Sequence, residues 1–190
     1  MPEGDRHFFL ANRGEHYRLL AYFSMIKNNS QYLDIGTLRG ASAVALAYNR
    51  SNKVISYDIS NNRITSVGIP NVEFRIGDVL EESNSFFKSF PLISLDVDHS
   101  GAFEKKFMKR MKDIGFSGLL LLDDINLNEP MRKFWNSIKL TKYDLTGFGH
   151  HSGTGLVDFT GKFKIYHSGS YSIALERNWK VATGVIKPVQ

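Results

Sequence analysis

The sequence contains no cysteine. This absence excludes disulfide bonds, a thiolate nucleophile and sulfur ligands for a zinc or iron site. The sequence also has no apolar run of about 20 residues, and its first residues lack a basic segment followed by a long apolar one. We therefore expect no membrane span and no secretion signal, which favours a soluble, cytoplasmic protein.

Charge of one sign is not concentrated in any segment. The net charge of +5 would suit an anionic partner, but lysine and arginine are distributed along the whole chain. A nucleic-acid partner is therefore not indicated. With 42% hydrophobic residues in 190, the chain can bury the core of one domain.

Short apolar segments that end in glycine or an acid alternate with helix-prone segments. We expect strands at 32–36, 53–58, 71–78, 91–98 and 118–124, and helices at 15–27, 41–49, 102–113 and 129–139. This alternation predicts an α/β fold, a parallel sheet with helices on both faces. Segments 142–148 and 154–160 predict two closing strands, antiparallel to the rest or to each other. The tail is ambiguous, with strand-like pieces at 163–166 and 171–175.

We expect one domain in three parts: an N-terminal helix or cap over 1–30, a core over 31–160 and a C-terminal extension over 161–190. Few residues precede the first expected strand. An acceptor site in such a chain is either open or completed by a second subunit, so a homodimer is one expectation.

The turn "DIGTLRG", residues 34–40, joins the first expected strand to a helix. Gly36 and Gly40 permit a sharp turn and a close approach of backbone to a ligand. The spacing differs from the dinucleotide motif G-x-G-x-x-G, which disfavours a pyrophosphate ligand. Asp58, at the end of the next strand, can accept hydrogen bonds from ribose hydroxyls, and Asp78 can receive an adenine amino group. The alternative is that the glycines are turn residues and the acids helix caps.

The segment "YLDIGTLRGASAVALA" resembles the first motif of class I S-adenosylmethionine-dependent methyltransferases, in particular the catechol-type O-methyltransferases. The resemblance covers about residues 15–160 and implies a Rossmann-like fold with a mostly parallel seven-stranded sheet. It also implies a set of residues that bind the methyl donor. Its members are Asp34, Gly36 and Ser42 around the methionine portion, Asp58 at the ribose and Asp78 near the adenine, together with Thr37, Gly40 and Asp96.

Two adjacent carboxylates, Asp123 and Asp124, follow the apolar run "LLLL". Such a pair at the rim of a buried strand needs compensation for its repulsion and lost hydration. Asp96 ends the preceding expected strand, and neighbouring parallel strands lie about 4.8 Å apart. We therefore expect Asp96, Asp123 and Asp124 to converge and to hold Mg²⁺ or a similar divalent cation. The alternative is that one of the pair caps the next helix while Asp96 pairs with a lysine.

The pattern "DVDHS" followed by "DD" resembles metal-dependent sugar O-methyltransferases of the macrocin type and the wider cephalosporin hydroxylase-like family. In that group the first acid and the later pair hold the metal. The resemblance implies that Asp98 or His99 is the catalytic base. We favour Asp98, because a lone histidine is more often a structural hydrogen-bonding residue, although imidazole suits this chemistry near neutral pH.

Two further segments contain histidine. In "GFGHHSGTG", residues 147–155, His150 and His151 could line a substrate pocket, but four glycines and no acid argue against a second metal site. The segment "GEHYR", residues 14–18, could lie over the cofactor or acceptor, or it could be a capped surface helix with Tyr17 packed inward.

Taken together, these features predict an S-adenosylmethionine- and metal-dependent O-methyltransferase that acts on a sugar or glycan hydroxyl. Two alternatives stay open: a methyltransferase for a phenolic small molecule or RNA, and a non-catalytic donor-binding module of a glycan-assembly protein.

Overall fold

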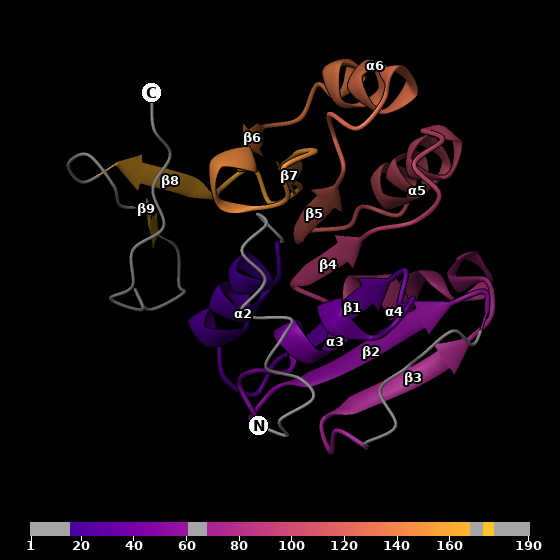
Figure 1. Cartoon of the computed structure of the whole chain (residues 1–190), viewed down its shortest axis with the longest axis vertical. Coiled ribbons are helices and arrows are strands. Elements are labelled where there is room, and N and C mark those ends of the chain that lie inside the picture. The colour runs from indigo at the N-terminus through magenta and orange to yellow at the C-terminus, as the bar shows by residue number, and fades with distance from the viewer. Residues whose placement is uncertain (1–15, 61–67, 168–172, 177–190) are drawn as a thin grey trace.

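Seven strands form the central sheet of the computed structural model, which describes residues 16–60, 68–167 and 173–176 (Figure 1). The strands are β1 (Gln31–Ile35), β2 (Lys53–Asp58), β3 (Val72–Ile76), β4 (Leu92–Leu95), β5 (Leu119–Asp123), β6 (Lys142–Asp144) and β7 (Thr154–Asp158). Their order is β3-β2-β1-β4-β5-β7-β6. Strands β1 to β5 are parallel, whereas β7 is antiparallel to both β5 and β6. The predicted mostly parallel, seven-stranded sheet is confirmed.

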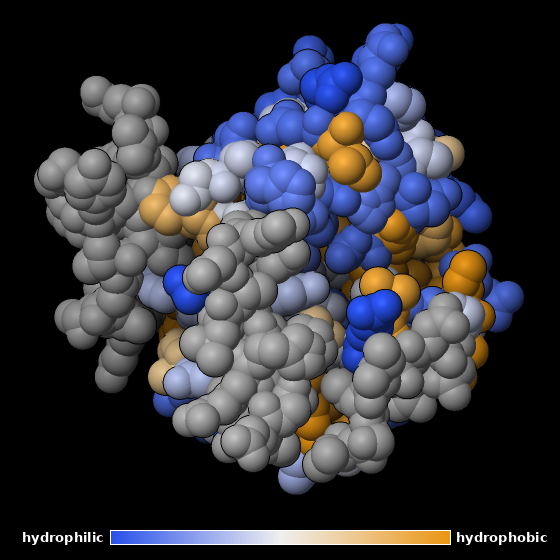
Figure 2. Space-filling model, viewed as in Figure 1, coloured by the Kyte–Doolittle hydropathy of each residue, from blue (hydrophilic) through white to orange (hydrophobic). Residues whose placement is uncertain are grey.

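Helices cover both faces of this sheet (Figure 1). They are α2 (Tyr17–Ile26), α3 (Ala41–Leu46), α4 (Asn84–Lys88), α5 (Ala102–Asp113) and α6 (Glu129–Ser137). Apolar residues of α2 and α3 pack on one face, and those of α4, α5 and α6 pack on the other. Figure 2 shows mainly hydrophilic atoms over α5 and α6, where the lysines of α5 are exposed.

The four leucines of β5 supply both halves of the core. Leu120 and Leu122 belong to the apolar cluster beneath α5 and α6, whereas Leu119 and Leu121 belong to the cluster beneath α2 and α3. All four are buried, because successive side chains of a strand point to opposite faces and helices cover each face. An uninterrupted apolar run is therefore what this central position requires.

The first of the two expected closing strands differs from the prediction. The strand expected over 142–148 ends at Asp144 and is followed by the 3₁₀ turn η3 (Thr146–Phe148). The Asp144 carboxylate accepts hydrogen bonds from the backbone and the hydroxyl of Thr146. This local bonding competes with continued strand pairing. A second 3₁₀ turn, η2 (Val79–Glu81), and α4 lie in a region for which the sequence predicted no element.

Beyond the main sheet, β8 (Lys164–His167) and β9 (Ile173–Glu176) form a two-stranded antiparallel sheet (Figure 1). Both expected tail strands are thus present, although residues 171 and 172 of the second prediction lie outside the described residues. The expected boundary at 160 falls within a turn in which the Asp158 carboxylate accepts hydrogen bonds from the backbone N–H groups of Thr160, Lys162 and Phe163. Within the described ranges, none of the helices has the length and apolar character needed to cross a membrane.

Candidate functional site

A cavity of about 450 Å³ lies at the carboxyl ends of β1, β2, β3 and β4. Six of the predicted site residues line it, namely Gly36, Asp58, Asp78, Asp96, Asp98 and His99. Ligands of open parallel sheets bind at this edge, where loops from several strands meet. Leu38 and Ile59, which also line the cavity, are exposed apolar residues.

The turn after β1 brings two strand ends into close contact. Gly36 has a φ of 98°, and a Cβ atom built on it would lie 1.5 Å from the carbonyl oxygen of Asp96. Only glycine fits this position, since a side chain would overlap the backbone of Asp96, directly after β4, and the positive φ is strained for other residues. Gly36 therefore determines how closely the turn after β1 approaches Asp96.

Four predicted donor-binding residues do not line the cavity: Asp34, Thr37, Gly40 and Ser42. The buried Asp34 carboxylate accepts hydrogen bonds from the hydroxyls of Ser42 and Ser56, at 3.0 and 2.6 Å. Thr37 is bonded in turn to Ser56 at 2.6 Å. These bonds hold the turn from behind, and contact of these four residues with a donor stays a prediction.

Burial raises the pKa of Asp34 to about 6, although the hydrogen bonds from Ser56 and Ser42 oppose this shift. The carboxylate can lose its proton near neutral pH only because these hydroxyls stabilise the ionised form. Its other oxygen, Oδ1, has no hydrogen-bond partner among the residues that the structure describes.

The two acids predicted to bind the nucleoside both have local partners. Oδ2 of Asp58 accepts from the backbone N–H of Leu38 at 2.7 Å, and Oδ1 accepts from the backbone and hydroxyl of Ser60. Asp78 caps η2 by accepting from the Leu80 N–H at 2.8 Å. Each carboxylate oxygen has more than one lone pair, so both acids can also accept from a ligand in the cavity.

At the acidic end, Asp96, Asp123 and Asp124 converge as predicted. Asp96 and Asp123 directly follow the paired residues Leu95 and Leu122 of neighbouring strands. Each of the three acids also lies close to histidine. His99 contacts Asp96 and Asp124, while His16 and His150 contact Asp123. The compensation that the adjacent acids require is therefore provided in part by three imidazole rings.

His99 lies between two of these carboxylates. Its Nε2 atom is 2.7 Å from Oδ2 of Asp124 and 3.3 Å from Oδ1 of Asp96, and its Nδ1 atom donates to the Val97 carbonyl at 2.6 Å. Because a carbonyl only accepts, Nε2 is the nitrogen that can take up a proton. His99 and Asp124 have φ values of 57° and 59°, a conformation that is uncommon outside glycine and is found at functional sites.

Asp98, the predicted base, is more exposed than His99. Its Oδ1 atom accepts hydrogen bonds from the backbone and the hydroxyl of Ser100. It lines the cavity, but the described contacts do not tie it to the other acids. The buried Glu104, one turn into α5, was not predicted from the sequence.

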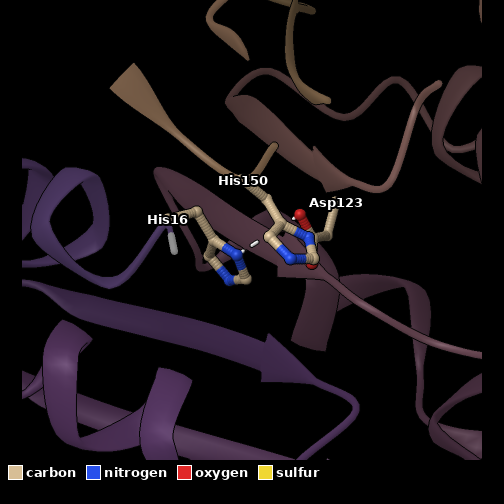
Figure 3. Close-up of side chains that lie close together, drawn as sticks. All are labelled: His16, Asp123 and His150. Atoms are coloured by element: carbon tan, nitrogen blue, oxygen red, sulfur yellow. Dashed lines mark ion pairs between the residues drawn. The ribbon is translucent and has the colours of Figure 1, made fainter. Parts of the chain in front are cut away.

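His16 and His150 come from opposite ends of the described core to meet Asp123 (Figure 3). His16 is buried at the start of α2, and its Nδ1 atom lies 3.3 Å from Oδ1 of Asp123. His150 Nδ1 lies 3.5 Å from Oδ2 of Asp123 and 2.8 Å from Oδ1 of Asp124. "GEHYR" therefore contributes a buried site residue rather than only a surface helix. Nothing in the local sequence pattern singles out His16, because its partner is more than a hundred positions away.

The loop before β7 is held so that His150 reaches the cluster. Backbone N–H groups of Ile125 and Asn126 donate to the carbonyls of Gly153 and Ser152. Ser152 also donates to the Asp124 carboxylate. His151 is exposed, and its ring contacts that of His150 edge-on, with the two ring centroids 4.4 Å apart. Of the two histidines predicted to line an acceptor pocket, only His150 thus lies among the acids, and neither is among the cavity-lining residues.

These contacts shift the pKa values of Asp96 and Asp123 in opposite directions. Burial, followed by the charge of Asp123, raises the pKa of Asp96 to about 7. Burial would also raise the pKa of Asp123, but the neighbouring imidazoles of His150 and His16 outweigh it and lower that pKa. Burial lowers the pKa of His16, but Asp123 outweighs it and the net shift is upward. The cluster therefore keeps Asp123 ionised and favours a proton on Asp96.

No protein-family model matches the sequence, and a search of curated proteins found no match. Solved structures do match the fold. A Staphylococcus aureus protein proposed to be a caffeoyl-CoA O-methyltransferase has a TM-score of 0.56 and 17% identity, over 75% of this chain and 82% of that one. The O-methyltransferase TomG of Streptomyces achromogenes, involved in tomaymycin synthesis and solved with S-adenosylmethionine, has a TM-score of 0.53 and 15% identity, over 75% and 78%. An O-methyltransferase from Bacillus cereus, solved with S-adenosylhomocysteine, has a TM-score of 0.51 and 17% identity, over 80% and 87%.

This chain has the class I methyltransferase fold. The cavity suits a donor without phosphate: it has exposed apolar residues at its rim and an acid at the end of β2, and the lining residues that the structure describes include no lysine or arginine. Asp96, Asp123 and Asp124 supply oxygen ligands of the kind that a divalent cation binds. The carboxylates are present, but a cation there would share them with, or displace, the histidines that they contact.

Proposed function

We propose that this protein is an S-adenosylmethionine-dependent O-methyltransferase. The observation that carries the proposal is the juxtaposition, on a methyltransferase fold, of a cavity of about 450 Å³ with a cluster of acids and histidines, of which Asp96 and His99 line that cavity. Asp58 and Asp78 would receive the ribose and the adenine, and Leu38 and Ile59 would cover the base with apolar surface. The turn held by Asp34 and Gly36 would support the methionine portion.

His99 is the base in this proposal, in place of Asp98. Its Nε2 atom faces the Asp96 and Asp124 carboxylates, which stabilise the imidazolium formed when it takes a proton. Asp98 stands in a more exposed position, and its described hydrogen bonds come from Ser100 and not from the residues of the acidic cluster. Asn128, which donates to the His99 carbonyl at 3.0 Å, helps to fix the backbone at this point.

The reaction is a single displacement. The acceptor oxygen forms a bond to the methyl carbon as the carbon–sulfur bond breaks, and the hydroxyl proton passes to Nε2 of His99. Asp96, Asp123 and Asp124 are the carboxylates available to hold a divalent cation, which when bound lowers the pKa of a coordinated hydroxyl and orients it. The protein contributes position, a proton acceptor and the negative charge that stabilises it.

A sugar or glycan hydroxyl is the acceptor we propose. Such a hydroxyl is much less acidic than a phenol and has the greater need of both a supported base and a cation. A phenolic acceptor is the second candidate, and it is favoured by the likeness to the Staphylococcus aureus protein proposed to act on caffeoyl-CoA. Both acceptors can present two neighbouring oxygens to the acidic end.

Two measurements test the proposal. Titration calorimetry with S-adenosylhomocysteine should give one site per chain, and Asp58→Ala should weaken binding at least tenfold because the ribose loses its acceptor. Methyl transfer should then be assayed on matched panels of glycosides and catechols.

His99→Ala should lower kcat by about 10²- to 10⁴-fold, the usual contribution of a general base. Asp98→Asn should lower it less, and donor binding should be unchanged in both variants. Full activity of His99→Ala would assign the base elsewhere, and the absence of donor binding by the wild-type protein would overturn the proposed function.

A further inference from the structure

The side chains of His16, Asp123 and His150 form a compact group at the inner end of the site (Figure 3). One ring nitrogen of each histidine and one oxygen of Asp123 lie within 4.8 Å of one another. We propose that this group, termed here the His16–Asp123–His150 site, binds a divalent first-row transition metal such as Zn²⁺, Co²⁺ or Mn²⁺ in preference to Mg²⁺. A role of this metal in methyl transfer rests on the proposed function, because the metal would lie beside the residues proposed to carry out that reaction.

The spacing of the ligand atoms suits a small cation. Ligands at about 2.1 Å from a common ion are roughly 3.0–3.4 Å apart at tetrahedral or right angles. Nδ1 of His16 and Oδ1 of Asp123 are 3.3 Å apart. The remaining ligand atom, from His150, lies within 4.8 Å of the other two.

Unpartnered buried atoms point to a missing ligand. Among the described residues, neither ring nitrogen of His16 has a hydrogen-bond partner, and the same is true of Oδ1 of Asp123. His16 is only 2% exposed. Its approach to Asp123 is thus an electrostatic pair without a hydrogen bond. A buried polar atom without a hydrogen-bond partner lowers the stability of the folded protein. A metal ion bound to His16 and Asp123 would offset that loss.

The ligand types select the class of metal. Two imidazoles and one carboxylate are the ligands that zinc, iron, cobalt and manganese accept, whereas Mg²⁺ prefers an all-oxygen set that retains several waters. An all-aspartate site would favour Mg²⁺. Because two of the three nearest donors here are nitrogen atoms, the preference is reversed.

Neighbouring groups orient the ligands as expected around a metal. Nδ1 of His150 is bonded to the Asp124 carboxylate at 2.8 Å, and Ser152 contacts both residues. A carboxylate bonded to one ring nitrogen fixes the tautomer in which the other nitrogen carries the lone pair that binds a metal. His99 is not one of the three residues whose ligand atoms lie within 4.8 Å of one another, so it remains outside this ligand set.

The test uses the full chain freed of metal by chelator and dialysis. Co²⁺ is added while visible absorption is followed, and Zn²⁺ and Mg²⁺ are each titrated by calorimetry. We expect one Co²⁺ or Zn²⁺ per chain, with visible bands characteristic of nitrogen and oxygen ligands, and Mg²⁺ binding at least 100-fold weaker. Equal affinity for Mg²⁺ and Zn²⁺, or no binding of Co²⁺ and Zn²⁺, would overturn the proposal and leave the histidines as ion-pair partners of Asp123.

Variants assign the ligands. His16→Ala and His150→Ala should each weaken Zn²⁺ binding at least 30-fold. His151→Ala is the matched control, since it removes an exposed imidazole beside His150 and should bind as the wild type does. Unchanged Zn²⁺ binding by folded His16→Ala and His150→Ala proteins would contradict the assignment.

A measurement on the wild-type protein keeps the test independent of variant folding. The Co²⁺-loaded protein should give two strongly shifted, exchangeable imidazole proton signals in its NMR spectrum, and fewer would contradict two histidine ligands. S-adenosylhomocysteine binding by the metal-free protein is measured in parallel. Binding of S-adenosylhomocysteine without binding of Zn²⁺ would contradict this inference alone. Binding of Zn²⁺ without binding of S-adenosylhomocysteine would contradict the proposed function alone.

Discussion

At the scale of single residues, Gly36 is the position with the least freedom. A Cβ atom there would lie 1.5 Å from the Asp96 carbonyl oxygen, and the φ of 98° is strained for any other residue. Gly36→Ala should therefore lower stability by more than about 1 kcal/mol and weaken S-adenosylhomocysteine binding at least tenfold. Urea unfolding and calorimetry measure the two effects. Gly68→Ala is the control, because a Cβ atom at Gly68 meets no atom of the described residues within 4 Å; equal behaviour of the two variants would contradict the role of Gly36.

Asp34 makes a pH-dependent contribution to stability. Its pKa is raised from 3.8 to about 6 in the folded protein, so the folded state holds the proton more tightly than the unfolded state. Stability from this group is present below about pH 4 and is lost as the pH rises to about 6, by roughly 3 kcal/mol. Asp34→Asn should remove this loss. The variant should therefore gain roughly 3 kcal/mol relative to the wild type between pH 4 and pH 7.

Urea unfolding of both proteins at several pH values measures this difference. Comparison with the wild type cancels the contributions of titrating groups that do not interact with Asp34; Asp58, Asp96 and His16 do interact with it. A stability difference that does not change with pH would contradict the assignment.

At the scale of elements, β5 connects the core to the site. Its leucines alternate between the two apolar clusters, and the strand ends on Asp123. Leu121→Ala should lower the free energy of unfolding by about 2–5 kcal/mol, because a fully buried side chain leaves a cavity. Leu127→Ala, at a half-exposed position a few residues later, should change it by less than about 0.5 kcal/mol. Chemical denaturation measures both, and similar values would mean that β5 is not the centre of the core.

At the scale of the whole molecule, the fold leaves its ligand cavity open at one edge of the sheet. A ligand that binds only the folded state at 100 times its Kd adds about 2.7 kcal/mol of stability. For a chain of this length, S-adenosylhomocysteine should then raise Tm by roughly 5–10 °C. Asp58→Ala should show a much smaller rise at the same concentration. Thermal unfolding checks this, and the same rise in both proteins would place the ligand elsewhere.

Much of this architecture follows from local pattern. The apolar run of β5 and the glycine turn after β1 predict buried parallel strands, because only such strands are covered on both faces. The strand-end acids Asp58 and Asp96 are likewise visible as residues at the ends of apolar runs. Prediction failed where short-range hydrogen bonds end an element, as Asp144 does when it binds Thr146 and stops β6.

The amino-acid sequence by itself determined the alternation of strands and helices, the glycine turn and the convergence of Asp96, Asp123 and Asp124, since each follows from the periodicity of a segment and from the rule that parallel strands end at one edge. Only the tertiary structure decided which residues compensate those acids. His16 and His150 are separated along the chain by nearly the whole described core, and no local pattern relates them. Packing of α2 against the sheet and the backbone bonds of the loop before β7 bring their rings to Asp123.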